Sequence, residues 1–116
     1  MATKNIQVEQ DERGSYYFIK VNEYFSSINV VDVRKAFEFA LEIGHNQIAL
    51  DLSEVVYMDS MSMGLILNIN DRLKKQEGKL VVVNPNTVAE DILNLSDASR
   101  FLEIHHNVEN VDIVFD

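Results

Sequence analysis

Two short, mainly apolar segments constrain the fold of this chain most strongly. They are QIALDLS at 47–53 and KLVVV at 79–83. Short apolar runs of this kind are typical of strands that are covered on both faces, as in a parallel sheet. Parallel neighbours need a long crossover connection, and the apolar residues of 60–77 recur with a helical period. We therefore predict a parallel β-sheet whose strands are joined by helices.

Three segments have apolar residues that recur on one helical face, at 30–43, from Ser60 to 77 and from Thr87 onward. Gly44 and Gly78 are predicted to lie just past the ends of the first two helices. Thr87 and Glu90 have the spacing of a capping box before the third. The predicted buried stripes are Val30, Val33, Phe37 and Leu41 in the first helix; Leu65, Ile66, Ile69 and Leu73 in the second; and Val88, Ile92 and Leu95 in the third.

The two ends of the chain complete the predicted sheet. Segments 5–10 and 16–22 read as two strands of a hairpin, with Gly14 in the turn. Near the other end, we expect a short edge strand at 101–105 and a last helical turn at 108–115. The prediction is an α/β fold with a mixed, mostly parallel sheet that opens with a hairpin and has helices mainly on one face. Residues 1–116 are expected to form a single domain.

The charge balance limits the partners that such a domain would bind. Ten basic residues stand against 19 acidic ones, for a formal net charge of −9. This charge repels phosphate backbones and anionic lipid surfaces, so neither nucleic acid nor a membrane is an expected partner. The chain has no cysteine and no apolar window approaching the ~18 residues that span a bilayer. We expect a cytoplasmic protein with no cofactor and no metal site.

Enzymatic chemistry has few candidate residues. His45, His105 and His106 are the obvious bases near neutral pH, and all three are predicted to be surface residues. The four glycines are scattered, without a phosphate-binding motif. A hydrolase that uses Ser60 or Ser62 as nucleophile stays open as a minor alternative, and it requires a histidine within hydrogen-bond reach. No catalytic residue is predicted.

The stretch YMDSMSMG, residues 57–64, stands where an apolar run gives way to a helical pattern. Either Asp59 or Ser60 could cap the helix. A hydroxyl at a helix N-terminus is also a favourable place for a phosphate, because free amides and the helix dipole favour an anion there. Met58, Met61 and Met63 are candidates for adaptable partner contacts, with core packing as the alternative for Met58 and Met63.

The segment LDLSEVVYMDSMSMGLILNINDRLKKQEGKLVVVN resembles the signature region of the STAS domain, in particular that of bacterial anti-sigma factor antagonists. Their pattern is Asp-Leu-Ser on a strand, then Asp-Ser-Ser/Thr-Gly-Leu-Gly opening a helix. The resemblance implies that Ser60 is phosphorylated by an anti-sigma factor that is a serine kinase. It also implies partner switching in transcription regulation: the unphosphorylated domain binds this kinase, the phosphorylated domain releases it, and a metal-dependent serine phosphatase restores binding. The expected oligomeric state is a monomer or a weak dimer.

The sequence departs from this pattern at two places. Met61, Ser62 and Met63 replace Ser/Thr, Gly and Leu, which makes Ser62 a secondary candidate acceptor. The loop that usually reads Gly-Glu-Leu-Asp is NEYF at 22–25, which keeps Glu23. The residues expected to bind the partner are Glu23, Met58, Asp59, Met61, Ser62 and Met63. The alternative function is that of a STAS scaffold or sensor subunit that is not phosphorylated and belongs to a larger signalling or transport complex.

Overall fold

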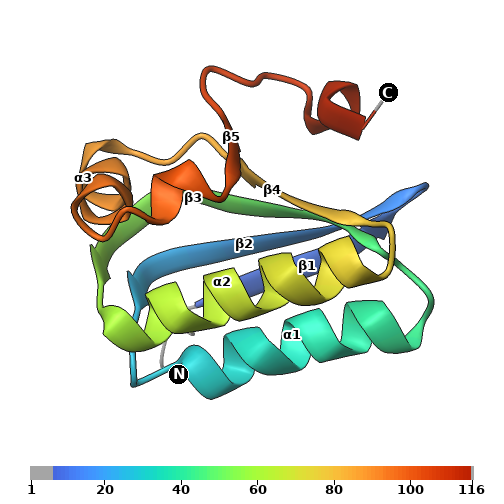
Figure 1. Ribbon diagram of the computed structural model, residues 1–116, viewed down its shortest axis with the longest axis horizontal. Coiled ribbons are helices and arrows are strands. Elements are labelled where there is room, and N and C mark those ends of the chain that lie inside the picture. Colours follow the sequence, from blue (N-terminus) through green and yellow to red (C-terminus); the bar gives the residue numbers. More distant parts are fainter. Residues whose placement is uncertain (1–6, 116) are drawn as a thin grey trace, which may run out of the picture.

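The computed structural model describes residues 7–115, which form one five-stranded sheet with helices around it (Figure 1). The strands lie side by side in the order in which they occur in the chain. The strands are β1 (Val8–Arg13), β2 (Tyr16–Phe25), β3 (Gln47–Met58), β4 (Lys79–Val83) and β5 (Glu103–His105). The helices are α1 (Val30–Glu42), α2 (Ser60–Lys75) and α3 (Thr87–Leu95), with the short 3₁₀ helices η1 (Ala98–Arg100) and η2 (Val111–Phe115).

The sheet is mixed, as the sequence predicts. β1 and β2 form an antiparallel hairpin, and every later pair of neighbours, from β2/β3 to β4/β5, is parallel. Gly14 occupies the hairpin turn with a φ of +62°. β2 is longer than predicted, because it continues beside β3 as far as the Phe25/Met58 pair through two irregularities in the register. The predicted first strand began at 5, and residues 5 and 6 lie outside the described part of the chain.

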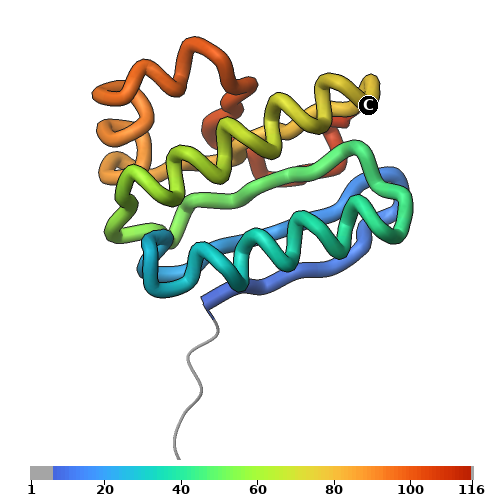
Figure 2. The backbone as a smooth tube through the Cα atoms, turned by 60° about the horizontal axis from the view of Figure 1, so that its bottom comes forward, coloured from blue at the N-terminus to red at the C-terminus, as the bar shows by residue number. Residues whose placement is uncertain are grey.

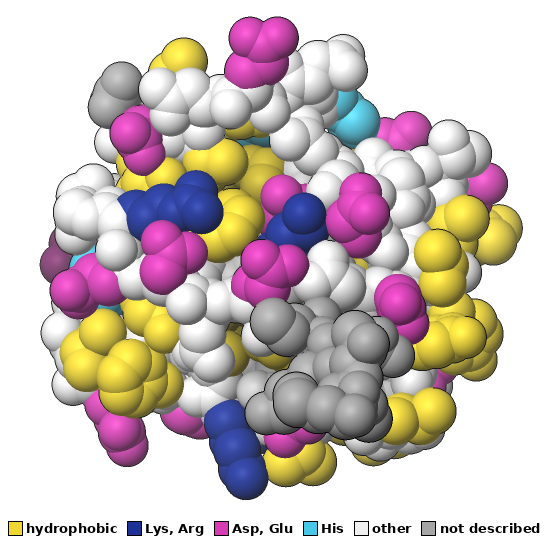
Figure 3. All heavy atoms as spheres, turned by 180° about the vertical axis from the view of Figure 1, so that it is seen from behind, with side chains coloured by type: hydrophobic (Ala, Val, Ile, Leu, Met, Phe, Trp, Pro, Cys, Tyr) yellow, Lys and Arg dark blue, Asp and Glu magenta, His cyan; other side chains and the backbone are white. Residues whose placement is uncertain are grey.

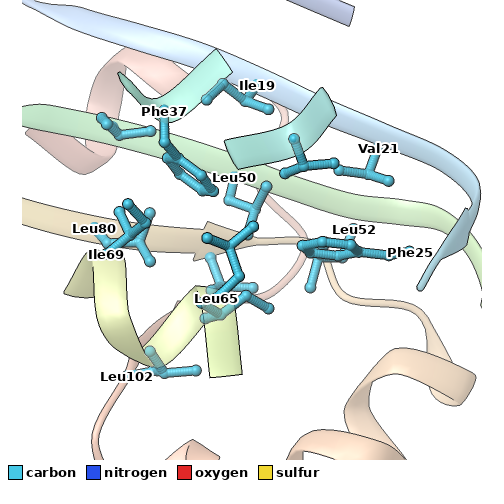
Figure 4. Packing of buried hydrophobic residues seen from close by; sticks show 14 of the residues in the cluster. Ile19, Val21, Phe25, Phe37, Leu50, Leu52, Leu65, Ile69, Leu80 and Leu102 are labelled. Atoms are coloured by element: carbon cyan, nitrogen blue, oxygen red, sulfur yellow. The ribbon is translucent and has the colours of Figure 1, made fainter. Parts of the chain in front are cut away.

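α1 and α2 lie next to each other on one face of the sheet, where they enclose the main core (Figures 1 and 2). The buried stripes predicted for these two helices are confirmed, with Leu41 only partly buried. Figure 4 shows how side chains from the sheet and both helices meet in this core. The labelled members that are fully or almost fully buried include Ile19, Val21, Phe25, Phe37, Leu50, Leu52, Leu65, Ile69 and Leu80. The predicted fold class is therefore correct.

The third helix has a different buried face from the predicted one. Ala89 and Leu93 are fully buried, whereas Val88 is 42% exposed and Leu95 is 86% exposed. The N-cap is Asn86, whose side chain accepts a hydrogen bond from the amide of Ala89 and donates to two carbonyl oxygens of β3. These bonds fix the rotation of α3 about its axis. The predicted stripe is thus wrong for Val88 and Leu95, while Ile92 is partly buried against the core, and the Thr87/Glu90 capping box is wrong.

The end of α2 also differs in detail from the prediction. Glu77, rather than Gly78, has the left-handed conformation that ends the helix, with a φ of 59°. Gly78 is needed for another reason, since a Cβ atom there would lie 1.9 Å from the carbonyl oxygen of Asn46. That oxygen accepts a hydrogen bond from the amide of Lys79 at the start of β4. Gly78 therefore allows β3 and β4 to begin side by side.

The C-terminal segment covers part of the opposite face of the sheet. Seen from behind, the surface of the molecule carries scattered acidic and basic side chains with apolar ones between them (Figure 3). A second, smaller apolar cluster lies here, made of Tyr16, Phe18 and Ala49, with Val111 and Phe115 packed against it. The rings of Tyr16 and Phe115 stack with centroids 4.6 Å apart. The edge strand and the last helical turn predicted from the sequence are both present as β5 and η2.

Candidate functional site

The stretch that the sequence singles out lies where β3 ends and α2 begins. The loop 26–29, between β2 and α1, lies beside it in both views of the backbone (Figures 1 and 2). A hydrogen bond from the backbone amide of Ser27 to Oδ2 of Asp59, 2.9 Å long, joins the two segments directly. The parallel pairing of β2 with β3 explains this proximity, because the carboxyl ends of parallel neighbours meet at one edge of a sheet.

Asp59 and Ser62 together cap α2. Oδ1 of Asp59 accepts hydrogen bonds from the amides of Met61 and Ser62, both 3.1 Å long. The hydroxyl of Ser62 accepts from the amide of Asp59 and donates to its carbonyl oxygen. This reciprocal capping box resolves the alternative left open by the sequence, since Asp59 and not Ser60 is the N-cap.

Ser60 is the first residue of α2, and its side chain is exposed. Within the described part of the chain, the Ser60 hydroxyl makes no hydrogen bond. The helix is therefore capped without it. Chemically, this hydroxyl is accessible for esterification at a helix N-terminus, where the amide groups and the helix dipole favour an anion.

The Asp59 carboxylate is stabilised in its charged form. Partial burial raises the pKa of this carboxyl group. Hydrogen bonds from the amides of Ser27, Ser62 and Met61 lower the pKa by more than burial raises it, so the net pKa lies below its ordinary value. Asp59 is therefore ionised at neutral pH, next to the exposed hydroxyl of Ser60.

The other residues predicted to bind a partner are divided between the surface and the interior. Met61 is 52% exposed, and Glu23 is exposed beside a register shift of β2, with a φ of 61°. Met58, Ser62 and Met63 are buried, at 4%, 0% and 6% exposure. These three side chains lie in the interior beneath the surface, so they do not offer the direct partner contact that the sequence suggested. The Ser62 hydroxyl is buried and makes both of its hydrogen bonds within the cap.

Three large apolar side chains near Ser60 were not predicted as site residues. Tyr24 and Tyr57 are 46% and 50% exposed, and their rings meet edge to face with centroids 6.5 Å apart. Ile28 is 86% exposed in the loop beside Asp59. We call the exposed residues Tyr24, Ile28, Tyr57 and Met61 the apolar rim. An apolar residue in a turn between polar ones, as in SSIN at 26–29, is the sequence signal that could have indicated Ile28.

The histidines are each bound to a carboxylate elsewhere in the molecule. His45 contacts Glu12, His105 contacts Glu103 and His106 contacts Glu90. Within residues 7–115, no hydrogen bond joins a histidine to Ser60 or Ser62, so the structure offers no base for a hydrolase at this place. The same residues contain no group of three or more side chains suited to hold a metal ion. None of the helices in this described range is long and apolar enough to cross a membrane.

Comparison with known proteins places this geometry in a family. Residues 5–111 match the model of the STAS domain. A candidate anti-sigma factor antagonist from Thermotoga maritima is 35% identical over 72 residues, which cover 62% of this chain and 64% of the relative. The match thus spans slightly less than two thirds of the length of that relative.

Solved structures agree with this assignment. The crystal structure of a candidate anti-sigma factor antagonist from Thermotoga maritima superposes with a TM-score of 0.81 at 26% identity, over 93% of this chain and 91% of that one. The anti-sigma factor antagonist SpoIIAA in its unphosphorylated form superposes with a TM-score of 0.77 at 17% identity, over 93% and 96% of the two chains, which shows a shared fold. On the family match and on this fold, the chain belongs to the STAS domain family.

Proposed function

We propose that this chain is an anti-sigma factor antagonist that works by partner switching. In its unphosphorylated form it binds an anti-sigma factor that is a serine kinase, and phosphorylation of Ser60 releases that partner. A serine phosphatase of the metal-dependent class restores the binding form. STAS proteins of the antagonist type are non-enzymatic regulators, so the chemistry of both steps belongs to the partners. The similarity to the antagonist of Thermotoga maritima supports this function.

The proposal rests on one observation: the residues that cap α2 are different from the residue that would accept the phosphate. Asp59 and Ser62 close the helix N-terminus, while the Ser60 hydroxyl is exposed between them in the sequence and makes no hydrogen bond within the described chain. Attachment of a phosphate to the Ser60 hydroxyl would therefore not use up any of the hydrogen bonds with which Asp59 and Ser62 cap α2. It would add about −1.5 to −2 charge beside the Asp59 carboxylate on a chain that already carries −9.

The apolar rim supplies the surface that a partner would cover. Tyr24, Ile28, Tyr57 and Met61 are between 46% and 86% exposed, and they come from the segments that meet at the start of α2. Aromatic residues and methionine are enriched in the centres of protein interfaces, and such a contact is sensitive to a nearby desolvated charge. Glu23, Asp59 and the rim form the proposed contact residues, with Met58, Ser62 and Met63 supporting them from below.

The test is a binding experiment with two charge variants. Immobilised wild-type protein is incubated with a lysate of the source cells, and captured proteins are identified by mass spectrometry; the expected partner contains a serine kinase domain. Ser60→Asp should lose this partner, whereas Asn68→Asp should keep it. The control places the same charge on an exposed position of α2 about 12 Å further along the helix, beyond a Debye length at physiological salt.

Incubation of the captured kinase with ATP should then add one phosphate to the wild-type chain, detected by intact mass, and none to Ser60→Ala. Equal capture by wild type and Ser60→Asp would refute the switch. Capture without any phosphate on Ser60 would instead support the alternative of an unphosphorylated scaffold subunit, which the replacement of the usual Ser/Thr and Gly by Met61 and Ser62 favours.

A further inference from the structure

Gly64 lies inside α2, where a glycine is unfavourable for the fold. It stands one turn into the helix Ser60–Lys75, and it is exposed. A glycine in a helix interior costs about 0.5–1 kcal/mol relative to alanine, because its backbone loses more conformational freedom on folding. The helix that carries the proposed phosphate acceptor is therefore less stable than it could be.

Packing within this chain does not explain this glycine. Gly14 and Gly44 have positive φ angles, and a Cβ atom at Gly78 would collide with the backbone of Asn46. Gly64 is outside the left-handed region, and a Cβ atom there would meet nothing within 4 Å. Alanine would fit at position 64 and would stabilise the helix. The reason for the missing side chain thus lies outside the fold.

Position 64 is the place on the helix from which a side chain would cover Ser60. Residues four apart lie on the same helical face, about 5.4 Å or one turn apart along the axis. Every Cα–Cβ bond of a helix is tilted toward the N-terminus, so the side chain of residue i+4 lies over the turn that carries residue i. A side chain at 64 would thus lean toward the Ser60 hydroxyl. Because glycine has none, this side of the hydroxyl is open.

The other residues around Ser60 leave this opening free. Met63, three positions along the helix, is 6% exposed and belongs to the core. Asp59 lies on the N-terminal side, where its carboxylate caps the helix. Met61 is 52% exposed and belongs to the apolar rim. The approach to the Ser60 hydroxyl from the C-terminal side therefore passes over the bare backbone at Gly64.

Phosphoryl transfer to Ser60 needs such an opening. The Ser60 oxygen forms a bond to the γ-phosphorus of a nucleoside triphosphate, the bond from that phosphorus to the β-phosphate oxygen breaks, and the hydroxyl proton passes to a base of the partner. Before the reaction, the oxygen has to come within about 3–3.5 Å of the phosphorus, in line with the leaving oxygen. A partner that encloses the hydroxyl this closely has to place part of its active site against the surface of α2.

We propose that Gly64 is the access residue for the phosphorylation of Ser60. It keeps free the side of the hydroxyl on which an active-site segment of the phosphorylating enzyme lies, with no room for a Cβ atom between that segment and the helix. This inference rests on the proposed function. It gives a reason for a glycine that the helix itself does not need.

Substitutions at position 64 separate recognition from folding. Gly64→Ala and Gly64→Gln should raise the melting temperature, because both residues are better helix formers than glycine. Both should nevertheless slow phosphorylation of Ser60 by the captured kinase, glutamine more than alanine. We expect a loss of about tenfold to a hundredfold in kcat/KM for Gly64→Gln, the effect of misplacing the reacting atoms by an ångström or so.

Asn68→Gln is the matched control, since it introduces the same residue at an exposed position one turn further along α2. It should be phosphorylated like the wild type. A merely structural defect at position 64 would lower stability and phosphorylation together, so opposite changes in the two quantities are specific to the proposal. Phosphorylation of Gly64→Gln at the wild-type rate would overturn it.

A second measurement needs no partner. The chain contains no cysteine, so Ser60→Cys places a single thiol at the acceptor position. Its thiolate attacks the aromatic disulfide dithiobisnitrobenzoate, forms a mixed disulfide and releases a coloured thiolate, whose absorbance gives the rate. In this background, Gly64→Gln should slow the reaction severalfold and Asn68→Gln should not. An unchanged rate with Gly64→Gln would show that position 64 does not cover position 60, and would overturn the proposal.

The two measurements distinguish this inference from the proposed function. If the wild-type chain receives no phosphate, the switch is refuted, while a slowed thiol reaction in Gly64→Gln would still support the opening over Ser60. If wild type and Gly64→Gln are phosphorylated equally fast, the switch stands and the access role of Gly64 is refuted.

Discussion

The hydroxyl of Ser62 donates to the carbonyl oxygen of Asp59 at 2.8 Å and accepts from the amide of the same residue at 3.1 Å. The two serines of the motif therefore have different tasks. Ser62 is fully buried and holds the start of α2, and Ser60 is exposed beside it.

The first prediction follows from this division. Ser62→Ala should lower the free energy of unfolding by about 1–2 kcal/mol, because it removes half of the capping box and leaves two backbone groups of Asp59 without their side-chain partner. Ser60→Ala should change it by less than about 0.5 kcal/mol, as an exposed substitution. Urea denaturation monitored by circular dichroism measures both. Equal effects of the two substitutions would show that the cap is not divided in this way.

The second prediction concerns two glycines with opposite surroundings. Gly78→Ala should destabilise the fold by about 1–3 kcal/mol or more, because its Cβ would meet the backbone oxygen of Asn46. Gly64→Ala is the control inside α2, where a Cβ meets nothing within 4 Å. It should stabilise by roughly 0.5–1 kcal/mol through helix propensity. Thermal unfolding of the two variants compares them, and a stable Gly78→Ala protein would contradict the tight approach of β3 and β4.

The third prediction is a pH dependence that arises from the pair Glu38 and Arg72, which joins α1 to α2. The two hydrogen bonds from the Arg72 guanidinium, 2.7 and 2.9 Å long, lower the pKa of Glu38 below its ordinary 4.5. A lowered folded-state pKa means that the pair stabilises fully above pH ~4.5 and that this contribution is lost as the pH falls through the folded value.

Glu38→Gln should therefore show a smaller loss of stability than the wild type between about pH 5 and pH 3. Both side chains are more than a third exposed, so solvent screening limits the difference to about 0.2–1 kcal/mol. Denaturation at a series of pH values measures it. A steeper acid decline in Glu38→Gln would reverse the sign and refute the assignment.

The fourth prediction concerns the attachment of the C-terminal segment. The Asn84 side chain donates to the carbonyl oxygen of Val108 and accepts from its amide, at 2.9 and 2.8 Å, and Asn84 has a left-handed φ of 52°. Asn84→Ala should accelerate amide exchange in 105–115 and cost about 1–3 kcal/mol, from two lost bonds and a strained backbone. Asn84→Gly keeps the backbone conformation and should cost less than Asn84→Ala. Unchanged exchange in both variants would show that the segment is held elsewhere.

The arrangement of the sheet and of the first two helices could be predicted from the sequence, because its patterns have only one interpretation there. In α1 and α2 the apolar residues mark a single face, and the runs at 47–53 and 79–83 are too apolar for an exposed strand. α3 was harder, because it carries apolar residues on two faces. Ala89 and Leu93 face the core, and Leu95 does not, since the bonds from Asn86 to β3 set the rotation.

The position of the candidate site was predictable from the sequence, but its surface was not. The motif places Ser60 at the helix start, as the structure has it, and its role as phosphate acceptor stays a prediction. Periodicity does not decide which of three closely spaced methionines is exposed when a strand changes into a helix, and only Met61 is. Tyr24 and Tyr57 meet only because β2 is paired with β3 through shifts in register, which a single sequence does not specify.

At the rim, exposed residues alternate with buried ones: Tyr24 is exposed and Phe25 is buried, Tyr57 is exposed and Met58 is buried, and Met61 is exposed while Ser62 is buried. Exposed substitutions away from caps and cores usually change stability by less than about 0.5 kcal/mol. Recognition can thus diverge through a few side chains while folding is preserved. Duplicated copies of such a domain could therefore come to bind different partners through changes at these positions alone.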